Sequence, residues 1–192
     1  MSKIELHGNE IFLIDANILI AAKNLYYNPK FCSIFWVKWL KTGIDTGKLR
    51  SIDKVKAELE DKNSEDFLSK KVEDGFFDNF WISTQDIVIV NHYKKLQNWA
   101  NNEWVKNKPL DKCQTALENF AQFENADPWL LSLAMSNKDY VIVTNEISAP
   151  NSTKNIKIPD AANADNFNIK VCNLYDLLNK HSYENQDFCF IN

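Results

Sequence analysis

The chain has 192 residues, of which 45% are hydrophobic and 25% are charged, a composition that suits one folded domain with its own core. Its formal net charge of −4 comes from 22 basic and 26 acidic residues, which excludes a basic protein that coats nucleic acid. Only 4 glycines are present, and no G-x-G-x-x-G sequence occurs. Residues 43–49 come closest to a nucleotide-binding P-loop, but this segment is one spacer short and ends in Leu49 where a Mg²⁺-binding Ser or Thr belongs.

The cysteines and histidines do not form a metal-binding pattern. The four cysteines have no C-x-x-C pair, and the three histidines neither cluster nor accompany them. A zinc site is therefore not indicated. Charged residues occupy the N-terminal segment, and no apolar run has the length of a membrane span. We expect a cytoplasmic protein with reduced cysteines and no membrane partner.

Short apolar runs alternate with longer helical patterns along the chain. Strands are predicted for residues 11–14, 49–52, 140–143 and 169–172. Helices are predicted from near Asn17, from Pro29 until Gly43 or Gly47, and over residues 54–60, 67–80, 87–105, 110–123, 127–135 and 174–178, with a helical turn beginning at Pro159. Asp53 and Asp127 are expected to cap the helices that follow them, and residues 61–66 are expected to form a loop.

This alternation predicts a single α/β domain over residues 1–180, with a short, mostly parallel sheet flanked by helices. Residues 181–192 are expected to be a loosely attached C-terminal tail.

Four acidic residues are candidates for one site. Asp15 and Glu146 follow the apolar strands 11–14 and 140–143, and ligands bind at the carboxyl ends of strands in open α/β sheets. Asp127 begins the helix before the latter strand, and Glu58 lies in the helix after strand 49–52. Carboxylates gathered in this way repel one another, and Mg²⁺ or Mn²⁺ bound by oxygen ligands would offset the repulsion.

Each acid also has a structural interpretation. Asp127 followed by Pro128 is a good helix cap. Glu58 can form ordinary ion pairs with Lys54 or Lys62, and Glu60 and Glu65 could take its place. Asp15 differs, because an ionised carboxylate directly after a buried strand requires polar partners or a metal.

The acidic segments resemble the motifs of PIN-domain nucleases. The resemblance rests on Asp15-Ala-Asn17, on Glu58 in Val55-Lys-Ala-Glu58-Leu, on Asp127, and on Thr144-Asn-Glu146, and it covers roughly residues 11–180. Residues 158–178 also resemble the ending of a bacterial PIN-like branch called DUF4411.

The resemblance implies a role for each matching residue. Asp15, Glu58, Asp127 and Glu146 would bind the metal and carry catalysis, although the family usually has Asp at the position of Glu146. Asn17 and Thr144 would orient the carboxylates or a metal-bound water, and Asn145 is a weaker candidate for that role.

The implied activity is hydrolysis of RNA phosphodiester bonds with Mg²⁺ or Mn²⁺. The resemblance further implies the toxin of a bacterial toxin–antitoxin pair, with an antitoxin protein as partner and a homodimer as a further option. Cations expected to follow the phosphates are Lys38, Lys41, Lys48, Arg50, Lys54 and Lys56, or Lys94 and Lys95. With one Arg in the chain, weak sequence specificity is expected.

Two alternatives stay open. The first is a PIN-like module with a degraded site that binds RNA or protein without cutting, which the Glu at position 146 favours. The second is another Asp-dependent phosphotransfer fold, although Asp15-Ala-Asn17 lacks the second Asp of the D-x-D-x-T motif of haloacid-dehalogenase-like enzymes.

Overall fold

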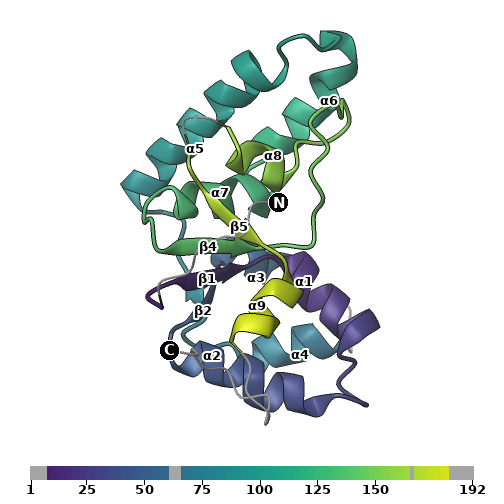
Figure 1. The fold of residues 1–192 in the computed structure, drawn as a ribbon, viewed down its shortest axis with the longest axis vertical. Helices are drawn as coiled ribbons and strands as arrows, with labels where there is room; N and C mark the ends of the chain where they lie inside the picture. Colours follow the sequence, from purple (N-terminus) through teal and green to yellow (C-terminus); the bar gives the residue numbers. More distant parts are fainter. Residues whose placement is uncertain (1–7, 61–65, 165–166, 182–192) are drawn as a thin grey trace.

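Five parallel strands form the centre of the molecule in the computed structural model, which describes residues 8–60, 66–164 and 167–181. Their order in the sheet is β3-β2-β1-β4-β5, and Figure 1 shows helices on both sides of the sheet. The strands are β1 (Ile11–Ile14), β2 (Leu49–Ile52), β3 (Trp81–Ile82), β4 (Tyr140–Val143) and β5 (Lys170–Cys172). The predicted α/β domain is confirmed, with a sheet that is parallel throughout.

The α-helices are α1 (Ala16–Ala21), α2 (Lys41–Asp45), α3 (Asp53–Leu59), α4 (Phe67–Glu73), α5 (Ile87–Trp99), α6 (Leu110–Ala121), α7 (Ala126–Ala134), α8 (Ile158–Ala162) and α9 (Leu174–Lys180). Three π-helical segments adjoin them at Ala22–Tyr26, Phe35–Leu40 and Ala100–Trp104. In Figure 1, α5 to α8 lie above the sheet, and α2, α4 and α9 lie below it.

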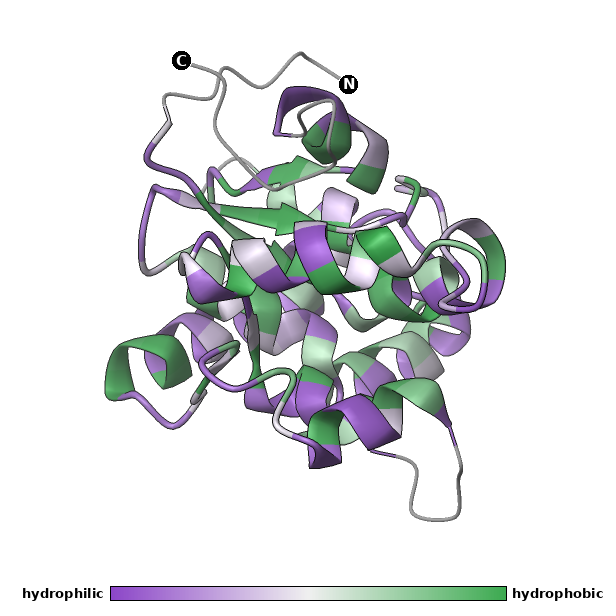
Figure 2. Cartoon of the chain, turned by 90° about the horizontal axis from the view of Figure 1, so that it is seen from below, coloured by the Kyte–Doolittle hydropathy of each residue, from purple (hydrophilic) through white to green (hydrophobic). Residues whose placement is uncertain are grey.

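The hydrophobic core lies where these layers meet the sheet. Phe12, Leu13, Val141 and Ile142 are fully buried, as expected for strands covered on both faces. Figure 2 shows that the strands are hydrophobic while most helices carry both hydrophobic and hydrophilic residues. Helix α7 is buried along nearly its whole length and contacts both β2 and β4.

The predicted strands at residues 11–14, 49–52 and 140–143 agree with β1, β2 and β4, and β5 is one residue shorter than predicted. Strand β3 was not predicted, because it has only two residues and follows an amphipathic segment that reads as a helix. That segment is helical only over α4, after which turns lead to Phe80, whose carbonyl accepts a hydrogen bond from Ser51 N at 2.8 Å.

The helix predicted from Pro29 begins later than expected, and it ends at the second of its two predicted stops. Pro29 lies in a turn and does not begin the next helix. Gly43 lies inside α2, where a Cβ would come within 2.4 Å of the Leu49 side chain, so glycine allows the helix to pack against β2. The helix ends just before Gly47, whose φ of +71° favours glycine.

The two predicted aspartate caps are also corrected. Asn125, not Asp127, caps α7, with its side chain accepting a hydrogen bond from Asp127 N at 3.1 Å. Asp53 is the first residue of α3 and does not cap it. Its carboxylate instead accepts hydrogen bonds from Thr84 N at 3.1 Å and from Thr84 Oγ1 at 2.8 Å, so it ties α3 to the segment after β3.

Two expectations concern residues at the edges of the described ranges. In the predicted loop 61–66, only Asp66 is described, and its side chain caps α4. In the predicted tail, only His181 is described, and it is buried beside Phe12, with ring centroids 5.1 Å apart; the rest of the tail lies outside the described residues. Within the described ranges, none of the helices has the length and apolar character to span a membrane.

Candidate active site

The candidate site lies where the strand order of the sheet reverses. Strand β1 pairs with β2 on one side and with β4 on the other. The chain therefore adds β2 and β3 on one side of β1 and then crosses to the other side to add β4 and β5. Such a reversal is where open α/β sheets bind their ligands. Because Ile14 pairs with Val143, Asp15 and Thr144 emerge next to each other at the carboxyl edge.

Neutral donors hold the Asp15 carboxylate. Thr144 Oγ1 donates a hydrogen bond to Asp15 Oδ2 at 2.7 Å, and Asn17 Nδ2 donates to the same oxygen. Asn17 Nδ2 also donates to Thr144 Oγ1 at 2.9 Å, and Asn17 Oδ1 accepts from Asn145 N at 3.2 Å. Asn17 and Thr144 therefore connect the ends of β1 and β4 and fix the direction of Asp15, the orienting role proposed for them from the sequence.

Asp15 is buried without a cationic partner among the described residues. It is 4% exposed, and this burial raises its pKa from 3.8 to about 6. The hydrogen bonds from Thr144 and Asn17 lower the pKa, while the negative charges of Glu146 and Glu58 raise it. Ionised Asp15 is therefore costly near neutral pH unless a cation approaches it.

The other three acids repel the carboxylate of Asp127. Burial of its carboxyl group raises its pKa well above the ordinary value, and repulsion by Asp15, Glu146 and Glu58 raises it further. Lys157 acts in the opposite direction. Helix α7 begins at the carboxyl edge of the sheet, so Asp127 in its first turn faces the same region as the strand ends.

Glu58 approaches this region from α3. Although the residue as a whole is exposed, its Oε1 accepts a hydrogen bond from Ala126 N at 3.4 Å, beside the start of α7. Burial raises the pKa of Glu58, and the bond from Ala126 lowers it. Glu58 therefore turns toward Asp127. Of its two structural alternatives, the pair with Lys54 is not formed, because Lys54 Nζ lies 3.4 Å from Glu124 Oε2 instead, and Lys62 lies outside the described residues.

Glu146 differs from the other acids because it has a cation of its own. Its Oε1 lies 2.5 Å from Lys157 Nζ, and its Oε2 accepts a hydrogen bond from Ile158 N at 2.8 Å. Its side chain is 14% exposed. The pKa of Lys157 is raised first by the hydrogen bond to Glu146 and also by the charges of Glu146, Asp127 and Asp15.

A cleft of about 160 Å³ opens at these side chains. Asp127, Glu146 and Lys157 line it, together with polar residues that include Asn119, Asn125 and Asn155. Carboxylates, amides and one ammonium group therefore face a small polar space at the edge of the sheet, where a hydrated cation or a phosphate oxygen can enter.

The side chains as they stand do not form a ready metal site. In the described parts of the chain, no group of three His, Cys, Asp or Glu residues is close enough to hold one ion. The structure brings Asp15, Glu58, Asp127 and Glu146 to one edge, but it holds Glu146 against Lys157. The metal-binding role of the four acids stays a prediction.

Sequence reasoning missed two residues of this site. Lys157 carried no signal, because a lysine between two isoleucines in a polar loop is ordinary. Ser51 is fully buried in β2, and its Oγ donates a hydrogen bond to the carbonyl of Ile14 at 2.6 Å, directly before Asp15. No sign of this role was visible in the sequence, because Ser51 follows Arg50 in a strand that is only half apolar.

Several cations expected to follow phosphates have other partners. Lys41 pairs with Asp45 and Lys56 pairs with Glu60. Lys54 lies over the ring of Phe123, with Nζ 3.4 Å from the centroid. Among the described residues, Lys157 is the cation that forms an ion pair with one of the four acids.

Comparison with known proteins gives one match. Neither the curated proteins nor the solved structures contain a match to this chain. The model of one protein family matches residues 12–184, a range that begins in β1 and includes all four acids. The chain belongs to the family described as "Domain of unknown function (DUF4411)".

Proposed function

We propose that this protein is a PIN-like endoribonuclease that requires Mg²⁺ or Mn²⁺. The observation that carries the proposal is the buried carboxylate of Asp15, held by neutral donors and repelled by other acids at the switch point of a parallel sheet. A buried carboxylate of this kind costs free energy when it is ionised, and a cation beside it would offset that cost. The fold and the order of the acids along the chain agree with the resemblance to PIN-domain nucleases.

The chemistry of the donor set fits a hard divalent cation. The groups available are carboxylate oxygens, with hydroxyl and amide groups behind them, and these are ligands that Mg²⁺ and Mn²⁺ prefer. Because no three acids converge on one point in the described parts of the chain, the side chains of Asp15, Asp127 and Glu58 would have to turn toward the metal to hold it. Glu146 would join them on leaving Lys157. When bound, the metal would supply an activated water and stabilise charge on the phosphate.

The residues of the chain itself account for substrate approach and orientation. Thr144 and Asn17 keep Asp15 directed at the edge of the sheet. Lys157 provides a positive charge among the acids, where it can attract an RNA phosphate that the net charge of −4 would otherwise repel. The narrow polar cleft suits a single strand better than a duplex.

Cleavage of a panel of single-stranded and structured RNAs tests this function. We expect cleavage with Mn²⁺ or Mg²⁺, none with a chelator, and none by the Asp15→Asn variant. The matched control is Glu118→Gln, an exposed residue of α6 whose hydrogen bond from Gln114 a glutamine can still accept; it should cut as the wild type does. Equal cleavage by Asp15→Asn would reject the assignment.

The biological role that we propose is that of a cytoplasmic toxin with an antitoxin partner. Expression of the wild type in a bacterial host should then arrest growth, whereas Asp15→Asn should not. A gene for a small antitoxin next to this one, whose product restores growth, would identify the partner.

The ion pair between Glu146 and Lys157 favours one other candidate, a PIN-like module that binds RNA or protein without cutting. In that case one acid is permanently neutralised by lysine. Calorimetry separates the two candidates, because the nuclease binds Mn²⁺ at the acidic edge and the binding module does not.

A further inference from the structure

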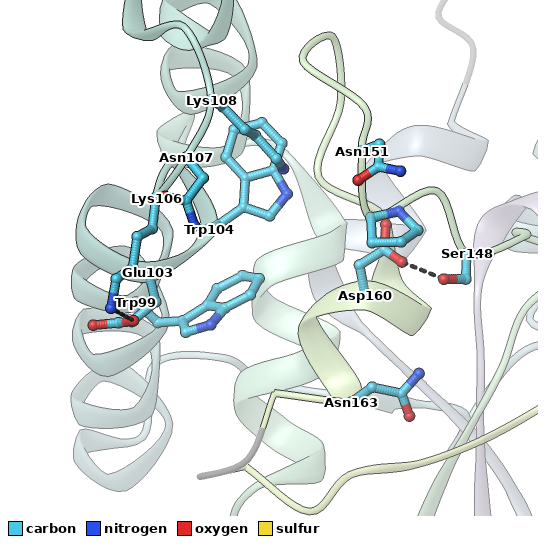
Figure 3. A pocket seen from close by; sticks show the side chains of 11 residues that line it. Trp99, Glu103, Trp104, Lys106, Asn107, Lys108, Ser148, Asn151, Asp160 and Asn163 are labelled. Atoms are coloured by element: carbon cyan, nitrogen blue, oxygen red, sulfur yellow. Dashed lines mark hydrogen bonds and ion pairs between the residues drawn. The ribbon is translucent and has the colours of Figure 1, made fainter.

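A second, larger cavity lies apart from the acidic cleft. It has a volume of about 570 Å³, within the range of small-molecule pockets. One wall comes from the end of α5 and the π-helical segment after it, and the other from residues 148–151 and α8. Figure 3 shows the indole rings of Trp99 and Trp104 on the first wall and the side chains of Asp160 and Asn163 on the second.

Two tryptophans give the first wall a flat aromatic surface. The ring of Phe167 packs against Trp99 in a T-shaped arrangement, with centroids 5.8 Å apart, and so helps to hold the indole in place. Trp104 is 6% exposed, and Lys108 Nζ lies 3.5 Å from the centroid of its ring. An indole that is held in place and borders a cavity is a suitable stacking partner for a planar ligand.

Two polar atoms at this wall lack a hydrogen-bond partner. Lys108 Nζ and Trp104 Nε1 are both buried, and neither finds an acceptor in the part of the chain that is described. Burial lowers the pKa of Lys108, although Cys113 and Asp160 act against it. Unpartnered buried donors cost free energy, which a ligand that carries acceptors would recover.

The charged residues that line the cavity are two acids and two lysines, so their formal charges cancel. Glu103 and Lys106 form an ion pair at 3.8 Å, and Lys108 faces the opposite wall that carries Asp160. The Asp160 carboxylate accepts hydrogen bonds from Ser148 Oγ and Ala149 N. A balanced set of donors and acceptors around an aromatic surface suits an uncharged planar ring better than a phosphate group.

One loop contributes residues to both the cavity and the acidic cleft. The chain leaves Glu146 at the cleft, passes Ser148 and Asn151 at the cavity, returns to the cleft at Lys157 and reaches the cavity again at Asp160. A strand of RNA cut at the cleft could place a neighbouring base in the cavity.

From this arrangement we propose that the cavity between Trp99 and Asp160 is a subsite for one nucleobase of a single-stranded RNA. The ring stacks on Trp99, Lys108 donates to an acceptor on the ring edge, and Asn151, Asp160 and Asn163 contact the remaining edge. The proposal rests on the proposed ribonuclease function for the identity of the ligand, but its test measures binding alone.

The test compares two fluorescein-labelled strands of roughly 12 nucleotides in the presence of a chelator, so that no cleavage occurs. One is a single-stranded RNA of mixed sequence, and the other has the same sugar-phosphate backbone without bases. Fluorescence anisotropy gives the affinity of each strand for the wild type and for Trp99→Leu. We expect Trp99→Leu to weaken binding of the base-bearing strand by roughly five- to a hundredfold and binding of the abasic strand by less than about twofold.

Two further variants complete the design. Lys108→Met removes the ammonium group that lies over Trp104 but keeps an unbranched side chain, and it should also weaken binding of the base-bearing strand alone. Tyr175→Leu removes an exposed aromatic of α9, on the opposite side of the sheet (Figure 1), and should leave both affinities unchanged. Circular dichroism checks that each variant is folded, and the comparison of the two strands on the wild type needs no variant.

Equal affinity of the wild type for both strands, or an equal loss for both strands in Trp99→Leu, would overturn the subsite. Cleavage assays on the same proteins distinguish this failure from failure of the proposed function. RNA cleavage without any dependence on Trp99 rejects the subsite and retains the nuclease. Base-dependent binding through Trp99 without cleavage retains the subsite and rejects the nuclease.

Discussion

Replacing Asp15 by Asn should make the metal-free protein more stable while it abolishes cleavage. Asparagine has nearly the same shape as aspartate. With its Oδ1 in the place of Asp15 Oδ2, it still accepts the hydrogen bonds from Thr144 and Asn17 Nδ2. Its amide nitrogen would take the place of Asp15 Oδ1, which in the wild type accepts a long hydrogen bond of 3.5 Å from Asn17 N. The substitution therefore removes a charge with little change in packing.

The magnitude follows from the pKa of Asp15. A rise from 3.8 to about 6 means that the folded state binds the proton more tightly than the unfolded state does. The cost of the ionised form is absent below pH 4, grows as the pH rises toward 6, and is complete above it. It amounts to roughly 3 kcal/mol, and relief of the repulsion on Asp127 acts in the same direction.

Urea unfolding followed by circular dichroism, with a chelator present, measures this difference at pH 4 and at pH 8. We expect wild type and Asp15→Asn to have similar free energies of unfolding at pH 4, and the variant to be more stable by roughly 3 kcal/mol at pH 8. Glu118→Gln, which removes an exposed charge, should follow the wild type at both values. A variant less stable than the wild type at pH 8 would refute the reasoning, because Asp15 would then have a stabilising partner.

Addition of Mn²⁺ at pH 8 should remove this difference. A cation that neutralises Asp15 and its neighbours stabilises only the protein that carries the charge, by about 3 kcal/mol at a concentration one hundred times the dissociation constant. The unfolding midpoint of the wild type should therefore rise, while that of Asp15→Asn stays constant. An equal rise in both proteins would place the cation elsewhere.

Three further substitutions test other contacts. Glu146→Gln should lower the cleavage rate by roughly 10- to 100-fold, less than Asp15→Asn does, because Lys157 already holds Glu146; a complete loss in single-turnover assays would mean that Glu146 is as essential as Asp15. Lys157→Met should weaken RNA binding and reduce its dependence on salt by about one ion, as measured by anisotropy over a range of salt concentrations; an unchanged slope would mean that no phosphate contacts it. Asp53→Ala should lower the free energy of unfolding by roughly 1–3 kcal/mol, since Thr84 N and Oγ1 lose their acceptor, and urea titration showing no loss would contradict this.

The fold was predictable where the chain is strongly apolar. Strands β1 and β4 stand out as short apolar runs typical of a buried parallel sheet, and the long helix α5 stands out by its periodicity. Strand β3 could not be found, because its two residues pair with β2 only after α4 has folded back. The sequence contains no local sign of a contact made in that way.

The acids were predictable because their positions depend on strand ends. A residue that directly follows a parallel strand lies at the carboxyl edge whatever else the chain does, and this places Asp15 and Thr144 together. Helix caps depend on shifts of one or two residues, so the sequence favoured Asp127 where Asn125 caps the helix. Which carboxylate pairs with which lysine depends on the loop conformation, and for that reason Lys157 was missed.

The loop between β4 and α8 explains why Glu146 has an ion pair with Lys157, while Asp15, Glu58 and Asp127 have none within the described parts of the chain. Glu146 lies where this loop leaves the sheet, and Ile158 N, which donates to it, lies where the loop ends. The pair with Lys157 therefore closes the loop at its base, and Asp160 bonded to Ala149 N and Ser148 closes it one turn further. Because the first contact borders the acidic cleft and the second borders the aromatic cavity, release of Glu146 toward a metal would loosen the segment that separates the two. Metal binding and RNA binding at Trp99 should consequently be coupled, and their mutual effect on affinity must be equal in both directions.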